Sequence, residues 1–141
     1  MSDENKAVVR RFFQEVFDNG NLEAIDQLMA ADVVDHELPP GLPPGREGTK
    51  AFLGMFLSAF PGMKMTIEDE MADGDKVVTR WTVTGTHTGE LMGIPPTNKQ
   101  VTVAGIDINR VAGGQIAEHW GQFDQMGMMQ QLGVIPTPGE G

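Results

Sequence analysis

The 141-residue sequence contains no cysteine and no tyrosine, and its basic residues are few. The absence of cysteine excludes disulfides, thiol nucleophiles and thiolate metal sites together. Ten Lys and Arg stand against twenty Asp and Glu, which gives a formal net charge of −10. A chain of this charge repels a phosphate backbone and offers no basic patch, so we do not expect nucleic acid as a partner.

Long hydrophobic runs are also missing. No stretch approaches the roughly 20 apolar residues that a membrane span needs. The opening residues, MSDENKAVVRR, lack the apolar core of a signal peptide. We therefore expect a cytoplasmic protein with no membrane partner. The length is that of one domain, which we place at residues 1–135, followed by a flexible tail at 136–141.

The first half of the chain has the periodicity of helices. Apolar side chains recur at helical spacing over residues 4–19, and shorter stretches of this kind cover 22–30 and 46–60. Residues 31–36 read as a brief extended segment. Four prolines in residues 38–45 exclude both a helix and a central strand, so this segment is predicted to be a semi-rigid loop.

The second half has the periodicity of β-strands. Alternating or β-branched runs cover residues 63–71 and 76–89, with an Asp-Gly hairpin signal between them. Two further strands are predicted at 100–111 and 115–123, joined by a tight glycine turn, and a last short helix at 126–132. Helices followed by four antiparallel strands indicate an α+β fold.

Most of the candidate chemistry lies on the last two predicted strands. Asp107 and Asn109 share one face of their strand, and Trp120, Gln122 and Asp124 share one face of the next. A carboxylate beside an indole inside a covered sheet favours a pocket at this place.

Three residues are candidates for acid–base catalysis: Asp124, Asp107 and His119. Burial against apolar walls raises the pKa of a carboxyl group toward the working pH, and histidine titrates there without help. We favour Asp124, because it has the parity of Trp120 and lies at a strand end, where a cavity can open. His119 has the opposite parity and is expected to face away if Trp120 lines the pocket.

Several of these residues also fit structural roles. Asp107 is equally compatible with a pairing to Arg80 or Arg110, because buried acids require a partner. His36, beside the proline loop, is either a gate of the pocket or a partly exposed turn residue. His87 fits a hydrogen bond at a strand end better than a catalytic role. The histidines lack an H-x-H or H-E-x-x-H spacing, so we expect no metal site.

The run from Val77 to Gly133, which holds THTGE, GIPPT and EHW in register, resembles the SnoaL-like polyketide cyclase family of the nuclear transport factor 2-like superfamily. The VVDH tetrad at 33–36 and the helical first half fit the same pattern, so the resemblance covers about residues 4–134. It implies a cone-shaped α+β barrel, in which a curved antiparallel sheet wraps around a deep apolar pocket and N-terminal helices close it.

The resemblance also implies a function. Cyclases of this family close a ring by an intramolecular aldol reaction on a hydrophobic polyketide ester, by acid–base catalysis without metal or cofactor. Family members often carry an aspartate directly after the His-Trp pair, whereas this sequence has Gly121. A non-catalytic domain that binds a hydrophobic small molecule is the alternative, because a fold does not fix a function. The residues expected to contact the substrate are His36, Arg80, Trp120 and Gln122.

Two related mechanisms are disfavoured by the residues they need. Limonene epoxide hydrolase-like proteins use an Arg-x-Asp pair and an aspartate two residues beyond a tryptophan. Here Thr82 stands two residues after Arg80, and Gln122 stands two after Trp120. Ketosteroid isomerase-like proteins use a tyrosine hydroxyl, and this chain has none.

The predicted strand at 76–89 carries apolar or β-branched residues on both faces, which is more than one pocket requires. We therefore expect the outer face of the sheet to bury against a second subunit, in a homodimer or a higher homo-oligomer.

Overall fold

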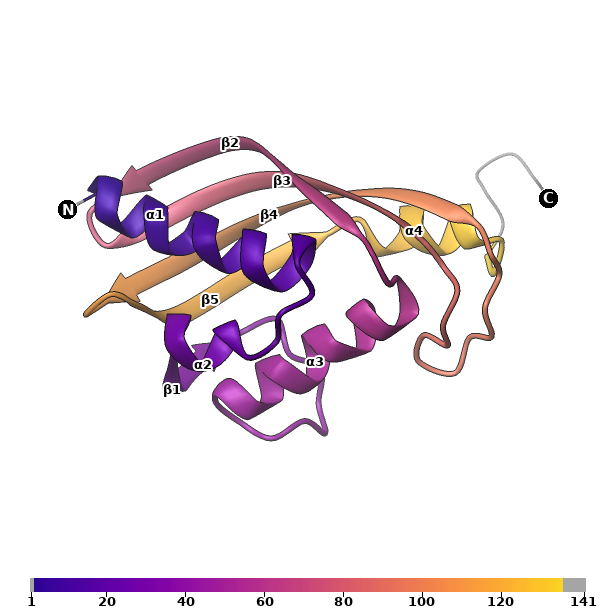
Figure 1. Cartoon of the computed structure of the whole chain (residues 1–141), viewed down its shortest axis with the longest axis horizontal. Coiled ribbons are helices and arrows are strands. Elements are labelled where there is room, and N and C mark those ends of the chain that lie inside the picture. Colours follow the sequence, from indigo (N-terminus) through magenta and orange to yellow (C-terminus); the bar gives the residue numbers. More distant parts are fainter. Residues whose placement is uncertain (1, 136–141) are drawn as a thin grey trace.

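Figure 1 shows the computed structural model, which describes residues 2–135 as a curved sheet with helices on one of its faces. The tail predicted at 136–141 lies outside these residues. None of the described helices is long and apolar enough to cross a membrane.

The three helical stretches predicted in the first half are confirmed, with shifted ends. The first helix continues into a π-helical turn and stops before Gly20, whose φ of 66° suits glycine. The second is shorter than predicted, because residues from Met29 onward are extended. The helical elements are α1 (Ser2–Phe13), η1 (Gln14–Asp18), α2 (Ala24–Leu28), α3 (Arg46–Ala59) and α4 (Gln125–Leu132).

The sheet has five strands in the order β1-β5-β4-β3-β2 and is open, since β1 and β2 form its two edges. The four strands predicted from the second half of the chain pair with one another in antiparallel fashion, as expected. The segment predicted only as brief and extended is a fifth strand, which pairs parallel to β5, so the sheet is mixed. The strands are β1 (Met29–Asp35), β2 (Lys64–Asp73), β3 (Lys76–Thr86), β4 (Gln100–Ala112) and β5 (Gln115–Phe123).

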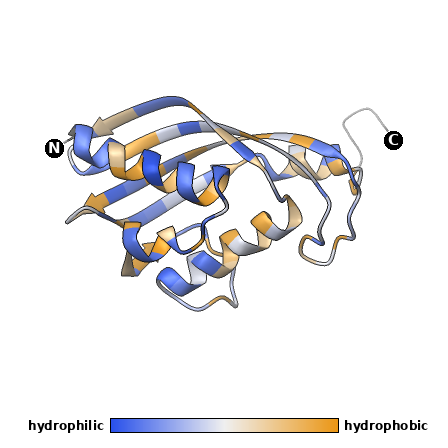
Figure 2. Ribbon diagram, viewed as in Figure 1, coloured by the Kyte–Doolittle hydropathy of each residue, from blue (hydrophilic) through white to orange (hydrophobic). Residues whose placement is uncertain are grey.

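The core lies between the helices and the inner face of the sheet. Burial alternates strictly along most of β4, and Figure 2 shows the corresponding bands of hydrophilic and hydrophobic residues along the strands. Val9, Phe13 and Val16 of the first helix pack in one buried cluster with Val77 and Trp81 of β3. A second cluster, which includes Phe60, Val103 and Met128, closes the end of the molecule near α4.

The hairpin between β4 and β5 contains a β-bulge. Gly113 and Gly114 both have positive φ, at 60° and 78°, as a two-residue hairpin turn requires. Val111 pairs with Ile116, but the next pair along the hairpin is Arg110 with Glu118, so one extra residue, Ala117, stands on β5. Beyond the bulge, Asn109 therefore lies opposite His119 and Asp107 opposite Gly121.

Candidate active site

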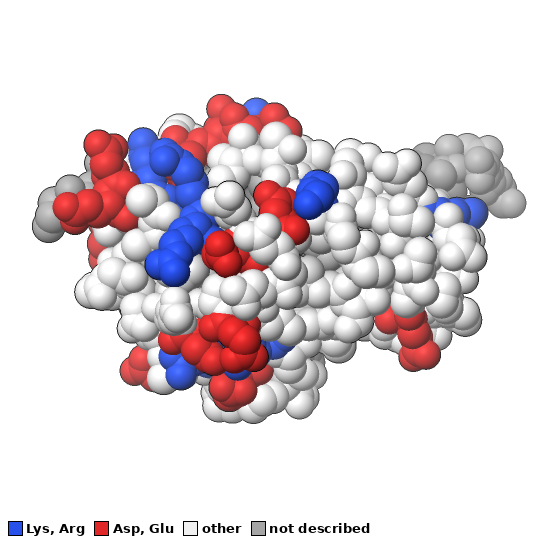
Figure 3. Space-filling model, viewed as in Figure 1, with Lys and Arg blue, Asp and Glu red and all other residues white. Residues whose placement is uncertain are grey.

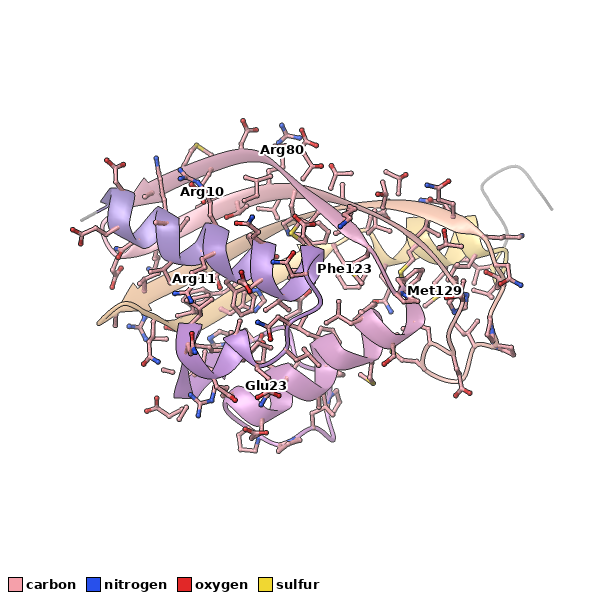
Figure 4. The ribbon with its side chains drawn as sticks, viewed as in Figure 1. Arg10, Arg11, Glu23, Arg80, Phe123 and Met129 are labelled. Carbon is pink, nitrogen blue, oxygen red and sulfur yellow. The ribbon has the colours of Figure 1, made fainter. Side chains whose placement is uncertain are left out.

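A cavity of about 100 Å³ lies between the inner face of the sheet and the helices. Its walls are largely aromatic and aliphatic, and Figure 4 shows Phe123 between the sheet and α3, where its ring meets Phe56 edge-on at 5.8 Å between centroids. The cavity's polar lining residues come from β1, the loop after it, α3, β4 and β5. They are Asp35, Glu37, Thr49, Asp107, Asn109 and His119.

The imidazole of His119 stands at the centre of this polar group. Its Nδ1 lies 2.8 Å from Asp35 Oδ1, and its Nε2 lies 3.3 Å from Asp107 Oδ2. Glu37 Oε1 is farther from Nε2, at 3.7 Å. The side chain of His119 is 12% exposed and that of Asp35 only 2% exposed, so these ion pairs are largely shielded from water.

Hydrogen bonds fix the carboxylate of Asp35, which in turn orients the imidazole of His119. Its Oδ2 accepts a hydrogen bond from the Thr49 hydroxyl at 2.8 Å, and its Oδ1 accepts one from the backbone N–H of Glu37 at 3.0 Å. The backbone N–H of His36 donates to the carbonyl of His119, which ties the end of β1 to β5 beside the site. A buried carboxylate with this many donors fixes the ring rather than reacts itself.

Asp107 and Glu37 converge on Gly121. Asp107 is buried, and its Oδ1 accepts no hydrogen bond from any residue that the structure describes. A Cβ at position 121 would stand 2.8 Å from this oxygen and 2.6 Å from Glu37 Oε1. Because residue 121 is glycine, the carboxyl groups of Asp107 and Glu37 both have room beside it.

The surroundings shift the pKa of three groups. Burial alone lowers the pKa of His119, but hydrogen bonds and charges of Asp107 and Asp35 outweigh it and raise this pKa to about 10. Burial raises the pKa of Asp35, yet the hydrogen bond and charge of His119 more than offset this and leave it below its ordinary value. Burial, followed by the charge of Asp107, raises the pKa of Glu37 to about 7, and His119 offsets this only in part.

This arrangement is suited to proton transfer. At neutral pH the site holds an imidazolium ion, a carboxyl group that is about half protonated and a buried carboxyl oxygen without a donor. A group whose pKa lies near the working pH can both give and accept a proton. The apolar walls next to it would exclude water from a reacting ligand.

The structure brings Asp107 and His119 together and places Asp124 elsewhere. Asp124 is the N-cap of α4, where its side chain accepts a hydrogen bond from the backbone N–H of Gly127 at 2.9 Å and is exposed to solvent. The expectation that Asp124 lies in the pocket is wrong, because the chain leaves the sheet at Phe123 and turns into a helix.

The faces of β5 are also the reverse of what we expected. His119 lines the cavity, whereas Trp120 lies on the outer face and stacks on His36, with 5.0 Å between the ring centroids. The bulge at Ala117 is the reason. Had the pairing of Val111 with Ile116 continued without it, Trp120 would stand opposite Asp107 on the inner face.

The remaining predicted contacts lie outside the cavity. Arg80 points away from the sheet in Figure 4, and its Nε lies 2.7 Å from Asp69, with both side chains more than half exposed. Arg80 therefore does not pair with Asp107, and it does not line the cavity. His36 and Gln122 line a groove that borders the cavity and shares Glu37 with it. Their predicted contact with a substrate stays a prediction.

His87 has the structural role that its sequence context favours. It is fully buried, and its Nδ1 accepts a hydrogen bond from the backbone N–H of Thr97 at 3.2 Å. This bond closes the loop between β3 and β4 on itself.

Three residues of the site were missed in the sequence: Asp35, Glu37 and Thr49. A usable signal existed for Asp35, which lies in the segment predicted to be extended, whereas Glu37 lies in the turn that follows β1. Thr49 carried no signal, because a threonine inside a helix is common.

Asp35, Glu37 and His119 also offer ligand atoms that lie within 4.8 Å of one another, as a metal site would require. Both nitrogens of His119, however, already face carboxylates, and its raised pKa keeps the ring protonated. A metal would have to displace that proton. The absence of a metal site stays a prediction.

Comparisons with known proteins identify the family and the fold. The sequence matches the model of the SnoaL-like polyketide cyclase family over residues 7–132. The structure of TsrD from Streptomyces laurentii is similar with a TM-score of 0.86 and 26% identity, over 96% of this chain and 98% of that one. A proposed polyketide cyclase from Bacillus cereus gives 0.80 and 36%, over 94% and 82%. IdmH, a proposed polyketide cyclase from Streptomyces antibioticus, gives 0.77 and 36%, over 92% and 99%. No curated protein matches the sequence significantly.

Proposed function

Because this chain belongs to the SnoaL-like polyketide cyclase family, we propose that it is a cofactor-independent cyclase that closes a ring in a hydrophobic polyketide ester by an intramolecular aldol reaction. The observation that carries this proposal is the buried Asp107–His119 pair at the polar end of an apolar cavity. An aldol closure needs a base for a C–H proton and a positive group near the enolate oxygen, and this pair supplies both.

Asp107 is the base in this mechanism. Its Oδ1 has no hydrogen-bond donor among the described residues, so it is free to take the proton from a carbon next to a carbonyl group. Asp35 and Asp107 keep His119 protonated, and its imidazolium charge opposes the negative charge that develops on the substrate. Burial strengthens this effect, because the charges act across little water.

The substrate lies across the cavity and the groove outside it. Four residues line both spaces: Glu37, Phe52, Phe56 and Phe123. Three of them are aromatic, so the planar, conjugated part of a polyketide can pack between their rings. The reacting carbons then lie at the boundary between cavity and groove, where Glu37 and Asp107 meet.

The test compares Asp107→Asn with Asp124→Asn on an anthracycline-type aromatic polyketide methyl ester. Asparagine is nearly isosteric but cannot act as a base, so Asp107→Asn should lower turnover at least about 10²-fold. Asp124 lies outside the cavity, and its replacement by asparagine, an equally good helix cap, should leave turnover unchanged. Thermal unfolding checks that both variants are folded.

Two results would contradict the proposal. Equal turnover by Asp107→Asn and by the native protein would show that Asp107 is not the base. A native protein that binds the ester, seen as a rise in its unfolding temperature, but never converts it would be a binding domain instead.

A further inference from the structure

Glu37 lies where the chain leaves β1, and its side chain turns toward Gly121 at the polar end of the cavity. It is 18% exposed and lines both the cavity and the groove that borders it. The carboxyl group therefore stands between the enclosed space and the solvent side, within reach of a ligand that occupies either.

Holding His119 does not explain this position. The imidazole already has a carboxylate on each nitrogen, Asp35 at 2.8 Å and Asp107 at 3.3 Å, while Glu37 is 3.7 Å away. A third carboxyl group beside one imidazolium costs free energy, because like charges repel where little water screens them. The fold nevertheless places the carboxyl group of Glu37 beside His119, and Gly121 leaves space for it.

The carboxyl groups of Glu37 and Asp107 approach Gly121 from two sides, and the negative charge of Asp107 favours the protonated form of Glu37. Glu37 Oε1 and Asp107 Oδ1 both come within 3 Å of the position that a Cβ at residue 121 would take, at 2.6 and 2.8 Å. Near neutral pH a partly protonated Glu37 therefore stands beside the negative charge of Asp107. A site with one carboxyl protonated and one ionised contains an acid and a base together.

We infer that Glu37 is a second catalytic residue, which acts beside Asp107 as the acid that completes the ring closure. This inference rests on the cyclase proposed above and assigns the proton donor that the reaction still needs. Gly121 is then the residue that makes the pair possible, since any side chain there would contact both carboxyl groups.

The proton balance of the reaction is closed by this pair. Asp107 takes the proton from the carbon next to the carbonyl group, and the electrons of the C–H bond form the enolate. The enolate carbon forms the new C–C bond with a ketone carbon of the same molecule, whose oxygen becomes an alkoxide. Glu37 gives its proton to that oxygen. The proton on Asp107 then passes to Glu37 and restores the resting state, with no oxidant, reductant or co-reactant.

The groups that act on Glu37 come from three strands. Burial contributes most to the raised pKa of Glu37, which is about 7. The negative charges of Asp107 on β4 and Asp35 on β1 raise this pKa further, and His119 on β5 lowers it. The Thr49 hydroxyl of α3 is engaged by Asp35 and leaves Glu37 without that donor.

The first test needs no substrate. Carbon-13 NMR of protein labelled at glutamate carboxyls should show one glutamate that titrates near neutral pH. Glu37→Gln should remove this signal, whereas Glu47→Gln, an exposed glutamate on α3, should not. Asp107→Asn should move the titration of Glu37 toward lower pH, because the charge of Asp107 is gone. Gly121→Ala should also disturb it, since the new Cβ contacts both groups.

The second test uses turnover of the same aromatic methyl ester. Glu37→Gln should lower kcat at least about 10-fold with little change in KM, since glutamine fills the same space but cannot donate the proton. The pH dependence of kcat should lose the step near neutral pH that the native protein shows.

The outcomes separate this inference from the proposed function. A Glu37 that titrates in the ordinary range of glutamate, or a Glu37→Gln variant as active as the native protein, would overturn the inference even if the protein is a cyclase. If the native protein shows no turnover, but Glu37 titrates near neutral pH and responds to Asp107→Asn, the two carboxyl groups interact as inferred and the proposed cyclisation is wrong.

Discussion

Asp35 is one of the two aspartates that keep the imidazole of His119 protonated. Its carboxylate meets Nδ1 of His119 and is itself fixed by Thr49 and by the backbone of Glu37. A histidine buried to this degree would ordinarily lose its proton, because burial disfavours the charged ring. The two aspartates beside it reverse that tendency.

We predict that Asp35→Asn lowers the pKa of His119 from about 10 toward neutral values, because one of the two carboxylates that raise it is lost. An NMR titration of the imidazole carbons measures this directly. Thr49→Val is the control, since it removes a donor to Asp35 and leaves the charge in place. An unchanged His119 pKa in Asp35→Asn would mean that Asp107 alone keeps the ring protonated.

Glu37 should make the folded state less stable as the pH rises. Its folded pKa of about 7 lies above the ordinary value of 4.5, so its contribution to stability is complete below about pH 4.5 and is lost as the pH passes 7. We predict that Glu37→Gln gains roughly 2 to 3 kcal/mol relative to the native protein between pH 5 and pH 8. Urea unfolding at the two pH values measures it, and a constant difference between the two proteins would contradict the raised pKa.

At the scale of elements, a bulge in one hairpin selects the residues of the site. Ala117 is the extra residue on β5, and from there His119, Gly121 and Phe123 lie opposite inner residues of β4. A shift of one residue turns every side chain of a strand to the other face. The bulge therefore determines that an imidazole, and not an indole, meets Asp107.

The helix that follows β5 depends on Asp124 as its cap. The carboxylate accepts a hydrogen bond from a backbone N–H that has no partner inside the helix. We predict that Asp124→Ala lowers the free energy of unfolding by about 1 kcal/mol, whereas Asp124→Asn changes it little. Both variants should keep the native turnover. A loss of turnover in Asp124→Asn would return this residue to the list of catalytic candidates.

At the scale of the whole molecule, charged residues are distributed unevenly over the surface. On the face shown in Figure 3, Lys and Arg lie among Asp and Glu over α1 and α2, and the part over the end of α3 and over α4 is mostly uncharged. Arg10 of α1, for example, pairs with Glu70 of β2 at 2.8 Å. The positive charges in this region are thus interspersed with negative ones.

The homodimer expected from the sequence remains a prediction, and the outer face of the sheet is where we place it. Ile106 of β4 is 51% exposed there, beside Gln122 on β5. Light scattering at micromolar concentration should give about twice the 15.3 kDa of one chain. Ile106→Glu should yield the monomer, because a charge would be buried in the contact, whereas Met126→Glu on α4 should not. A native protein of 15.3 kDa would exclude the dimer.

The α+β architecture and the positions of most elements could be predicted from local sequence patterns. Helical spacing, the change of period after Gly62 and the paired glycines at 113 and 114 are local signals, because they follow from backbone geometry and from the neighbours of each residue. The resemblance to the family further predicted that the sheet is curved and that N-terminal helices close it. Asp107 and His119 were among the three acid–base candidates in the sequence, although His119 was expected to face away from the pocket.

Only the tertiary structure decided which side chains meet. The parallel pairing of β1 with β5 joins Asp35 to His119 across 84 positions, and no local pattern encodes it. The bulge at Ala117 reversed the face of Trp120, since the pairing of two strands depends on contacts along both of them. The role of Gly121 likewise depends on the tertiary structure, because the space that it leaves is used by Glu37, from the turn after β1, and by Asp107, from β4.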